Sequence, residues 1–403
     1  MKKNAFTLIE LLAVIAILTI IMVISVPQLI TSIKNKKTDA LEKTKDLLTS
    51  AARNYVIDYE LKVPTSISIE TLCKNDYLEC PIKNPIDNSN LNGYVNVDDN
   101  KVYVYSDTRD YITIRDYIID LYNDESLRTS NGLKKDNTVD TNIRYYGSDP
   151  NNYVSFNNEL WRIIGVFGNN VKLVRSESLG SLSWDSSDSS INKGNGINQW
   201  GESTDVNGNT YLGADLQVYL NKMYYGGVET TCYNGADNSE TTCPTNTLDR
   251  TAKLLIDKHT WSLGAIEMSI EDTISFYNAE RGTAKWTGYV ALPYITDWAY
   301  ASSESACETN IQAKDSSNLF VCKNNNWMQR SDWTWYLSPS GQSADASNAW
   351  AVSGNNNYVY YRMFGAMNKF ASYDYDVAPS IYLKSSVLMK GGTGTSSDPY
   401  KLA

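Results

Sequence analysis

The sequence predicts an α+β protein with a long N-terminal helix, a small antiparallel β head and a larger mixed α+β domain. Three observations support this prediction. Residues 6–26 are almost wholly apolar, and apolar residues recur at helical intervals to about residue 61. Two alternating runs flank a turn within residues 93–105, as in a β-hairpin. From about residue 140, Tyr, Trp, Asn, Ser and Gly dominate short strand-like runs, which predicts a twisted antiparallel sheet with long loops.

Length and charge limit the possible functions. The chain has 403 residues, above the size at which one hydrophobic core usually stops growing, so we expect at least two folded units. It is 42% hydrophobic and 20% charged, which is ordinary for a globular protein. The net charge of −10 provides no basic field for phosphate groups. We therefore expect no nucleic-acid binding by the C-terminal domain.

The apolar N-terminal segment has the length of a membrane span and contains one acid. A helix over 6–26 extends about 30 Å, the thickness of a hydrocarbon core. Lys2 and Lys3 precede it, which places the short leader in the cytoplasm. Glu10 lies inside the segment, where a charge costs about 3 kcal/mol, so it needs a partner. Cleavage before Phe6 would create an amine one helical turn from Glu10, in the same subunit or in a neighbour.

The run Ala5-Phe6-Thr7-Leu8-Ile9-Glu10 resembles the cleavage and methylation motif of type IV prepilins and type II secretion pseudopilins. The resemblance implies that prepilin peptidase removes the leader 1–5 between Ala5 and Phe6, and that Phe6 becomes N-methylated. It also implies that 6–27 is a transmembrane and assembly helix, with Glu10 contributing to assembly with other pilin subunits. Glycine is usual in place of Ala5, so we expect slower cleavage.

This resemblance predicts a location but leaves two alternatives open. The chain is expected in the cytoplasmic membrane as a single-pass precursor and then at the cell surface in a filament. An ordinary signal anchor would share the apolar length. A signal peptide cut near Val23-Ile24-Ser25 would instead release a secreted protein.

Residues 28–106 are expected to form an amphipathic helix and a small pilin-like head. Pro64 ends the helix, and a short helix is predicted near 69–74. Residues 107–139 are predicted to be a connecting helix and linker, with 111–130 amphipathic.

Patterns further along the chain predict local elements. They indicate a hairpin over 159–174, a helix over 212–225, and core strands at 333–337, 349–352, 358–361 and 380–383.

Six cysteines fall into three close pairs, which favours local disulfides in an oxidising compartment. The disulfide candidates are Cys73 with Cys80, Cys232 with Cys243, and Cys307 with Cys322. Zinc is the competing explanation, but the chain has one histidine and no CxxC spacing, so no metal site is expected. Other pairings and unpaired buried thiols also remain open.

Residues 140–403 resemble a domain of unknown function found in bacterial surface proteins. The resemblance depends on four motifs: Trp161-Arg162-Ile163, Tyr219-Leu220-Asn221 with Tyr224, Trp335-Tyr336-Leu337-Ser338-Pro339, and Val377-Ala378-Pro379-Ser380-Ile381-Tyr382-Leu383. It implies a fold similar to C-type-lectin-like and formylglycine-enzyme-like domains. The resemblance implies no particular ligand-binding residues.

The sequence contains no clear catalytic motif. His259 is the single histidine, and its surroundings predict a surface or capping position late in a helix. Residues 136–142 and 205–209 offer oxygen atoms for calcium but lack the twelve-residue calcium-loop pattern, so solvated turns are expected. We expect no cofactor and no enzymatic activity.

The tyrosines and tryptophans suggest binding as well as packing. The chain has 29 Tyr and 10 Trp, and such side chains give large contact areas with a polar end. We predict that Trp161, Trp335 and Trp350 are core residues, and that loops 183–210 and 297–330 form a face for a glycan or protein ligand. The preferred interpretation is a minor or tip-located subunit with an adhesion domain. The alternatives are a membrane-anchored extracellular enzyme and a secreted binding module.

Overall fold

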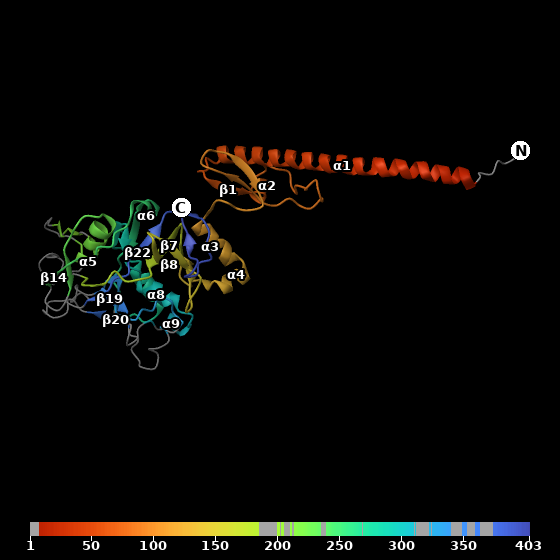
Figure 1. Ribbon diagram of the computed structural model, residues 1–403. Coiled ribbons are helices and arrows are strands. Elements are labelled where there is room, and N and C mark those ends of the chain that lie inside the picture. The colour runs from red at the N-terminus through yellow and green to blue at the C-terminus, as the bar shows by residue number, and fades with distance from the viewer. Residues whose placement is uncertain are drawn as a thin grey trace. The chain divides into compact units, whose positions relative to one another are not determined.

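The computed structural model consists of two compact units, Met1–Ile112 and Thr113–Ala403, here called unit 1 and unit 2 (Figure 1). The structure describes residues 8–403 with these exceptions: 185–199, 202, 205–209, 212, 235–238, 268, 310, 312–321, 324, 340–348, 353–358 and 363–373. The sequence predicted the border at 139–140, and the structure places it before the first helix of unit 2.

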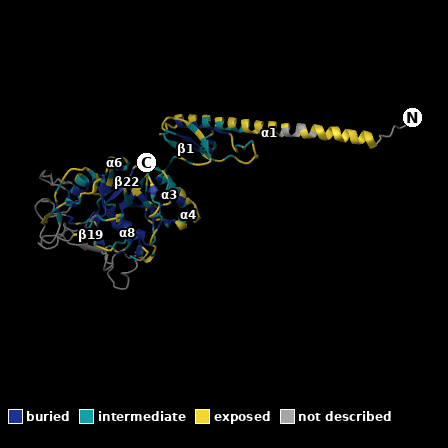
Figure 2. Ribbon diagram, viewed as in Figure 1, coloured by how far each residue is buried: buried dark blue, intermediate teal, exposed yellow. Residues whose placement is uncertain are grey.

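Unit 1 is built on one long helix, α1 (Leu8–Asp58), which has 51 residues. At 1.5 Å per residue its axis is about 75 Å long. The helix runs uninterrupted through Pro27, and it ends before Pro64, as the sequence predicted. The described side chains of its N-terminal half are exposed, and its C-terminal half packs on the head (Figure 2).

The head of unit 1 is a three-stranded antiparallel sheet in the order β1-β2-β3. Its strands are β1 (Thr65–Ser68), β2 (Tyr94–Val97) and β3 (Tyr103–Ser106), and α2 (Ile69–Lys74) follows β1. The predicted hairpin is confirmed as β2 and β3, with Val97 opposite Tyr103. Asp98 stabilises the turn because its side chain accepts hydrogen bonds from the backbone N–H groups of Asn100 and Val102.

The first helices of unit 2 replace the connector that the sequence predicted. β4 (Ile112–Thr113) leads into α3 (Ile114–Asn123), and α4 (Glu125–Ser130) follows because Asp124 ends one helix and caps the next. Ile114, Ile118 and Leu121 are buried in the core of unit 2. Since this apolar face needs the sheet to cover it, the segment belongs to the second unit and not to a linker.

An eight-stranded sheet forms the centre of unit 2. Its main path is β17-β22-β9-β8-β6-β5, and β7 pairs with both β8 and β24. The strands are β5 (Leu133–Lys135), β6 (Ile143–Tyr145), β7 (Tyr153–Phe156), β8 (Glu159–Phe167), β9 (Asn170–Arg175), β17 (Val290–Ala291), β22 (Ser380–Leu383) and β24 (Tyr400–Lys401). The pairings are antiparallel except that of β7 with β24, and the predicted hairpin near 159–174 is β8 with β9.

A second sheet has the order β10-β21-β18-β19-β20. Its strands are β10 (Ser181–Leu182), β18 (Thr334–Pro339), β19 (Ala349–Val352), β20 (Val359–Arg362) and β21 (Tyr375–Asp376). The remaining described strands are short: β11 (Ser203–Thr204), β12 (Thr210–Tyr211), β13 (Cys232–Asn234), β14 (Ser239–Thr241), β15 (His259–Ser262), β16 (Lys285–Gly288) and β23 (Leu388–Met389). The antiparallel sheets and core strands predicted from the sequence are therefore present.

The remaining described helices of unit 2 are also short. They are α5 (Asp215–Val218), the π-helix η1 (Tyr219–Tyr225), α6 (Arg250–Leu255), α7 (Thr273–Glu280), α8 (Ile295–Ala301) and α9 (Ala306–Thr309). The helix predicted over 212–225 is thus α5 continued by η1. Every residue of α8 is buried.

The core of unit 2 is rich in aromatic residues. Trp161, Trp335 and Trp350 are fully buried, which confirms them as core residues. Trp184 packs edge-on against Trp335, with ring centroids 5.8 Å apart. Such contacts add to the hydrophobic stabilisation from the buried ring area.

All three predicted disulfides are present in the structure: Cys73–Cys80 in unit 1, and Cys232–Cys243 and Cys307–Cys322 in unit 2. Each closes a short loop, which limits the freedom of the unfolded chain.

The close approach of β8 to β6 requires glycine at residue 165. A Cβ atom on Gly165 would lie 2.2 Å from the carbonyl oxygen of Ile143. We expect Gly165→Ala to destabilise unit 2 by about 2 kcal/mol, since the strands must separate. All ten tryptophans lie in unit 2, so denaturant unfolding followed by tryptophan fluorescence measures this change.

Gly168→Asn is the matched control for this prediction. Gly168 has φ +58° and open space around its Cα, and asparagine tolerates this conformation. Equal stability of the Gly165→Ala and Gly168→Asn proteins would contradict the explanation.

Candidate assembly segment and candidate ligand pocket

The N-terminal half of α1 is the candidate assembly segment. Glu10 lies in its first turn, whereas Ala5 and Phe6 lie outside the described residues. Leu8 and Ile9 are 76% and 78% exposed. Exposed apolar side chains occur in adjacent pairs, each separated from the next by one residue, and so surround the helix: Leu11, Leu12, Val14, Ile15, Ile17, Leu18, Ile20, Ile21 and Val23.

A helix that is apolar on every side is normally covered by lipid or by other protein. The C-terminal half of α1 differs, because Leu48, Ala52 and Val56 are buried against the head on one face only. The helix therefore combines an uncovered apolar segment with a segment that holds a folded head. No helix in the described part of the chain has a stretch long and apolar enough to be recognised as a membrane span.

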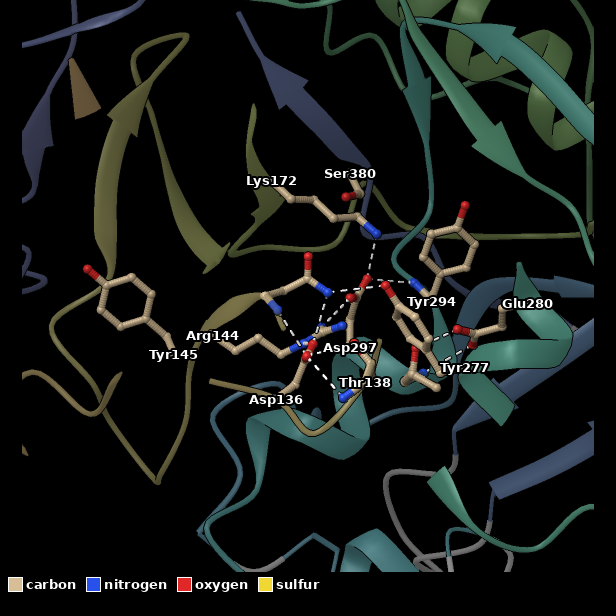
Figure 3. Close-up of polar contacts among 12 residues, drawn as sticks. Asp136, Thr138, Arg144, Tyr145, Lys172, Tyr277, Glu280, Tyr294, Asp297 and Ser380 are labelled. Carbon is tan, nitrogen blue, oxygen red and sulfur yellow. Dashed lines mark hydrogen bonds and ion pairs between the residues drawn. The ribbon is translucent and has the colours of Figure 1, made fainter. Parts of the chain in front are cut away.

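A buried charge network lies at the centre of unit 2 (Figure 3). Arg144 of β6 donates from Nε to Asp136 Oδ2 at 2.6 Å and from Nη1 to Asp297 Oδ1 at 2.8 Å. Lys172 of β9 donates from Nζ to Asp297 Oδ2 at 2.5 Å, and the backbone N–H of Tyr294 donates to the same oxygen at 2.9 Å. The two acids and two bases are all buried.

The network connects α8 to the large sheet. Asp297 lies on α8. Its partners Arg144 and Lys172 lie on β6 and β9, two strands of the large sheet. Burial alone raises the pKa of Asp297, but Lys172 and Arg144 outweigh burial and hold the pKa below its usual value. The pKa of Asp136 is also lowered, because Arg144 and hydrogen bonds overcome the effect of burial. Both carboxylates therefore stay ionised at neutral pH.

Helix α8 in turn positions the segment 326–330. Asn326 Nδ2 donates to the carbonyl oxygen of Trp298, and Trp298 Nε1 donates to Gln329 Oε1 at 3.1 Å. Asn326 also donates to the carbonyl oxygen of Cys322, which belongs to the third disulfide. Trp327 Nε1 donates to the carbonyl oxygen of Tyr145, next to Arg144. The charge network, the disulfide and these hydrogen bonds together hold 326–330 against the sheet.

A cavity of about 260 Å³, here called the arginine pocket, lies between this segment and strands β7, β8 and β9. Arg162, Arg175 and Arg330 line it, together with aromatic, hydroxyl and apolar side chains. Arg175 is paired with Glu159 through two contacts, at 2.8 and 3.2 Å. The pocket includes 327–330 of the predicted ligand face 297–330, whereas most of the other predicted face, 183–210, lies outside the described residues.

His259 does not lie late in a helix, as the sequence predicted. It begins β15, stacks on Tyr382 with ring centroids 3.7 Å apart, and its Nδ1 lies 3.4 Å from Asp257 Oδ2. Burial lowers the pKa of the imidazole, so the ring is neutral at pH 7. The error arose because residues 250–258 have helical character, whereas the pairing of β15 with β16 is a longer-range contact.

The segment 136–142 is only in part the solvated turn that was expected, because residues 137 and 139–141 are exposed whereas 136, 138 and 142 are buried. Asp136 accepts hydrogen bonds from Thr138, Asn142 and Arg144. These contacts use the oxygen atoms that were considered for calcium. The second candidate, 205–209, lies outside the described residues, and the described residues contain no group of three or more metal-ligating side chains.

Residues 1–26 match the family model of the prokaryotic N-terminal methylation motif. The N-terminus is that of a type IV prepilin or pseudopilin. This motif implies processing by prepilin peptidase, a membrane-anchored precursor, assembly with other pilins and a surface location after processing. No curated protein and no solved structure matches the chain. The resemblance of 140–403 to surface domains and C-type-lectin-like folds therefore stays a prediction.

For this pilin-like precursor, the sequence predicted the methylation motif but did not predict the charge network or the arginine pocket. Trp161-Arg162-Ile163 was the one relevant signal, since it predicted a strand with an arginine inside it. No sequence pattern near Arg330 indicated that this residue would line the same pocket as Arg162.

The charge network generates a stability prediction. Asp297→Asn leaves Lys172 and Arg144 without their shared carboxylate, so we expect a loss of about 3–5 kcal/mol. The lowered pKa values of Asp297 and Asp136 mean that stability is complete above their unfolded values, about pH 4, and is lost as the pH falls through the folded values. Fluorescence-monitored unfolding between pH 7 and 3 measures both effects.

Asp149→Asn is the control, because this side chain is 71% exposed and pairs with Arg162 at 3.2 Å. It should change the free energy of unfolding by less than about 1 kcal/mol. A wild-type stability that does not decrease below pH 4 would show that the buried pairs contribute no pH dependence.

Proposed function

We propose that this chain is a minor or tip-located subunit of a type IV pilus or a type II secretion pseudopilus, with a non-enzymatic C-terminal domain that acts in adhesion. The observation that carries the proposal is the methylation motif at 1–26, continued by a helix whose first half is apolar and exposed. A filament core formed by such helices would cover that apolar surface.

The size of unit 2 supports a minor or tip position. Thr113–Ala403 is much larger than the head of unit 1, which ends at Ile112. A regular filament repeats its subunits at short intervals, and a large unit on every subunit would crowd the surface. A subunit present in few copies avoids this crowding.

The aromatic composition of unit 2 supports binding in place of catalysis. Its one histidine, His259, stacks on the ring of Tyr382. The buried acids Asp136 and Asp297 form ion pairs with basic side chains. An adhesion role needs only a displayed surface and a disulfide-stabilised fold.

In this proposal Glu10 pairs with the amine of Phe6 that cleavage creates. A carboxylate within an apolar segment costs about 3 kcal/mol without a partner. Pairing within the subunit would lower that cost in the membrane, and pairing between subunits would fix their register.

The test compares three proteins in cells: the wild type, Glu10→Val and the control Glu42→Val. Glu42 is exposed on the same helix, and it forms an ion pair with Lys45 at 2.9 Å. Mass spectrometry of the N-terminal peptide should show N-methylphenylalanine at residue 6 in the wild type and the control. We expect Glu10→Val to insert into the membrane but to fall at least about tenfold in sheared filaments, a change of roughly 1.4 kcal/mol or more.

Two outcomes would contradict the proposal. A mature N-terminus near Val26 would indicate release by signal peptidase. Equal incorporation of Glu10→Val and Glu42→Val would show that the carboxylate has no function in assembly.

A further inference from the structure

The arginine pocket has more positive charge than its own acids balance. Its carboxylate is Glu177, and its three bases are Arg162, Arg175 and Arg330. Arg175 is neutralised by Glu159, which lies outside the lining. Two arginines, Arg162 and Arg330, and one carboxylate, Glu177, therefore remain in the lining, an excess of one positive charge.

Arg330 has no carboxylate within ion-pair distance in the described part of the chain. Its Nη1 and Nη2 donate to the carbonyl oxygens of Ser176 and Arg175, at 2.8 and 2.7 Å. These two bonds orient the guanidinium without neutralising it. Burial lowers the pKa of Arg330, which is the effect expected of a cation whose charge is incompletely compensated.

Arg162 is also held in one orientation. Its Nε donates to Asn152 Oδ1 at 2.7 Å, and the guanidinium lies 4.0 Å from the ring centre of Tyr153 and 4.7 Å from that of Trp327. Its ion-pair partner, Asp149, is 71% exposed, so that pair contributes little. The rings and the amide therefore position a charge that stays available to a ligand.

One hydroxyl of the lining has no hydrogen-bond partner among the described residues. Ser176 Oγ is buried without one. Buried donors without partners are uncommon in proteins, and a bound ligand is one way to satisfy this donor.

We propose that the arginine pocket binds one acidic sugar residue, with its carboxylate between Arg162 and Arg330. Guanidinium groups bind carboxylates through charge-assisted, often bidentate hydrogen bonds. The volume of about 260 Å³ is sufficient for a single sugar ring. The remaining lining combines hydroxyl groups with the apolar Leu160, Val174 and Pro293, which suits a ring that carries hydroxyl groups and C–H faces.

This inference rests on the proposed function, because it names the ligand class for the adhesion unit. Its test uses the full-length protein in detergent and does not depend on filament assembly. A failure of assembly and a failure of binding are therefore distinguishable.

The probes are glucuronate, N-acetylneuraminate, glucose and an acidic dipeptide, titrated by calorimetry and by saturation-transfer NMR. We expect an acidic sugar to bind, glucose to bind at least about tenfold more weakly, and binding to weaken as the salt concentration rises. Arg330→Gln should reduce the affinity at least about tenfold, since it removes a guanidinium group that can bind the carboxylate through two hydrogen bonds.

Two further variants keep the test independent of folding. Tyr336→Phe retains the buried ring and removes only the hydroxyl, so it should weaken binding several-fold at unchanged thermal stability. Arg250→Gln removes an exposed arginine outside the lining and should bind like the wild type. Absence of binding at millimolar acidic sugar, preference for the dipeptide, or equal affinity in Arg330→Gln and Tyr336→Phe would each overturn the proposal.

Discussion

The physical constraint on which the protein depends is the uncovered apolar surface of the first half of α1. Water around that surface is unfavourable, and the exposed apolar side chains between Leu8 and Val23 point to every side of the helix, so the rest of unit 1 cannot cover them all. The second half of the same helix buries Leu48, Ala52 and Val56 against the head. One continuous helix thus divides into a part that requires an external partner and a part that carries its own fold. The methylation motif at its start is consistent with a partner that is first lipid and then other pilins.

Unit 2 depends on a different constraint, the pairing of charges that have been removed from water. Asp297 accepts from Arg144 and Lys172 and from the backbone of Tyr294, so its oxygen atoms are well satisfied. These donors replace water favourably only if their hydrogen-bond geometry to Asp297 is maintained. The requirement holds α8 in place against the sheet. Through Trp298 and Gln329 the same helix supports the segment that brings Arg330 to the pocket. Stability and the candidate ligand site therefore share one set of contacts.

Local patterns predicted the local elements well. The β2–β3 hairpin, α2, the β8–β9 hairpin and β22 followed from alternation, turn residues and helix-ending signals, all of which act over a few residues. The disulfides also connect cysteines close in sequence. The predictions that were wrong or missing concern contacts between residues far apart in the sequence. α3 was assigned to a linker because its amphipathic pattern does not say which sheet covers it. The pairing of Arg144 with Asp297, and the approach of Arg330 to β9, join residues about 150 positions apart and leave no local signal.

The most direct test of the central claim is the accessibility of α1 in assembled filaments. The six cysteines of the chain are all in disulfides, so an introduced cysteine is the only free thiol. Ile17 is 58% exposed and Val139 is 86% exposed, which makes Ile17→Cys the probe and Val139→Cys the control in sheared surface filaments. The account predicts that a membrane-impermeant thiol reagent labels the cysteine at 139 and not the one at 17. Equal labelling of both, or absence of the chain from the filaments, would contradict it.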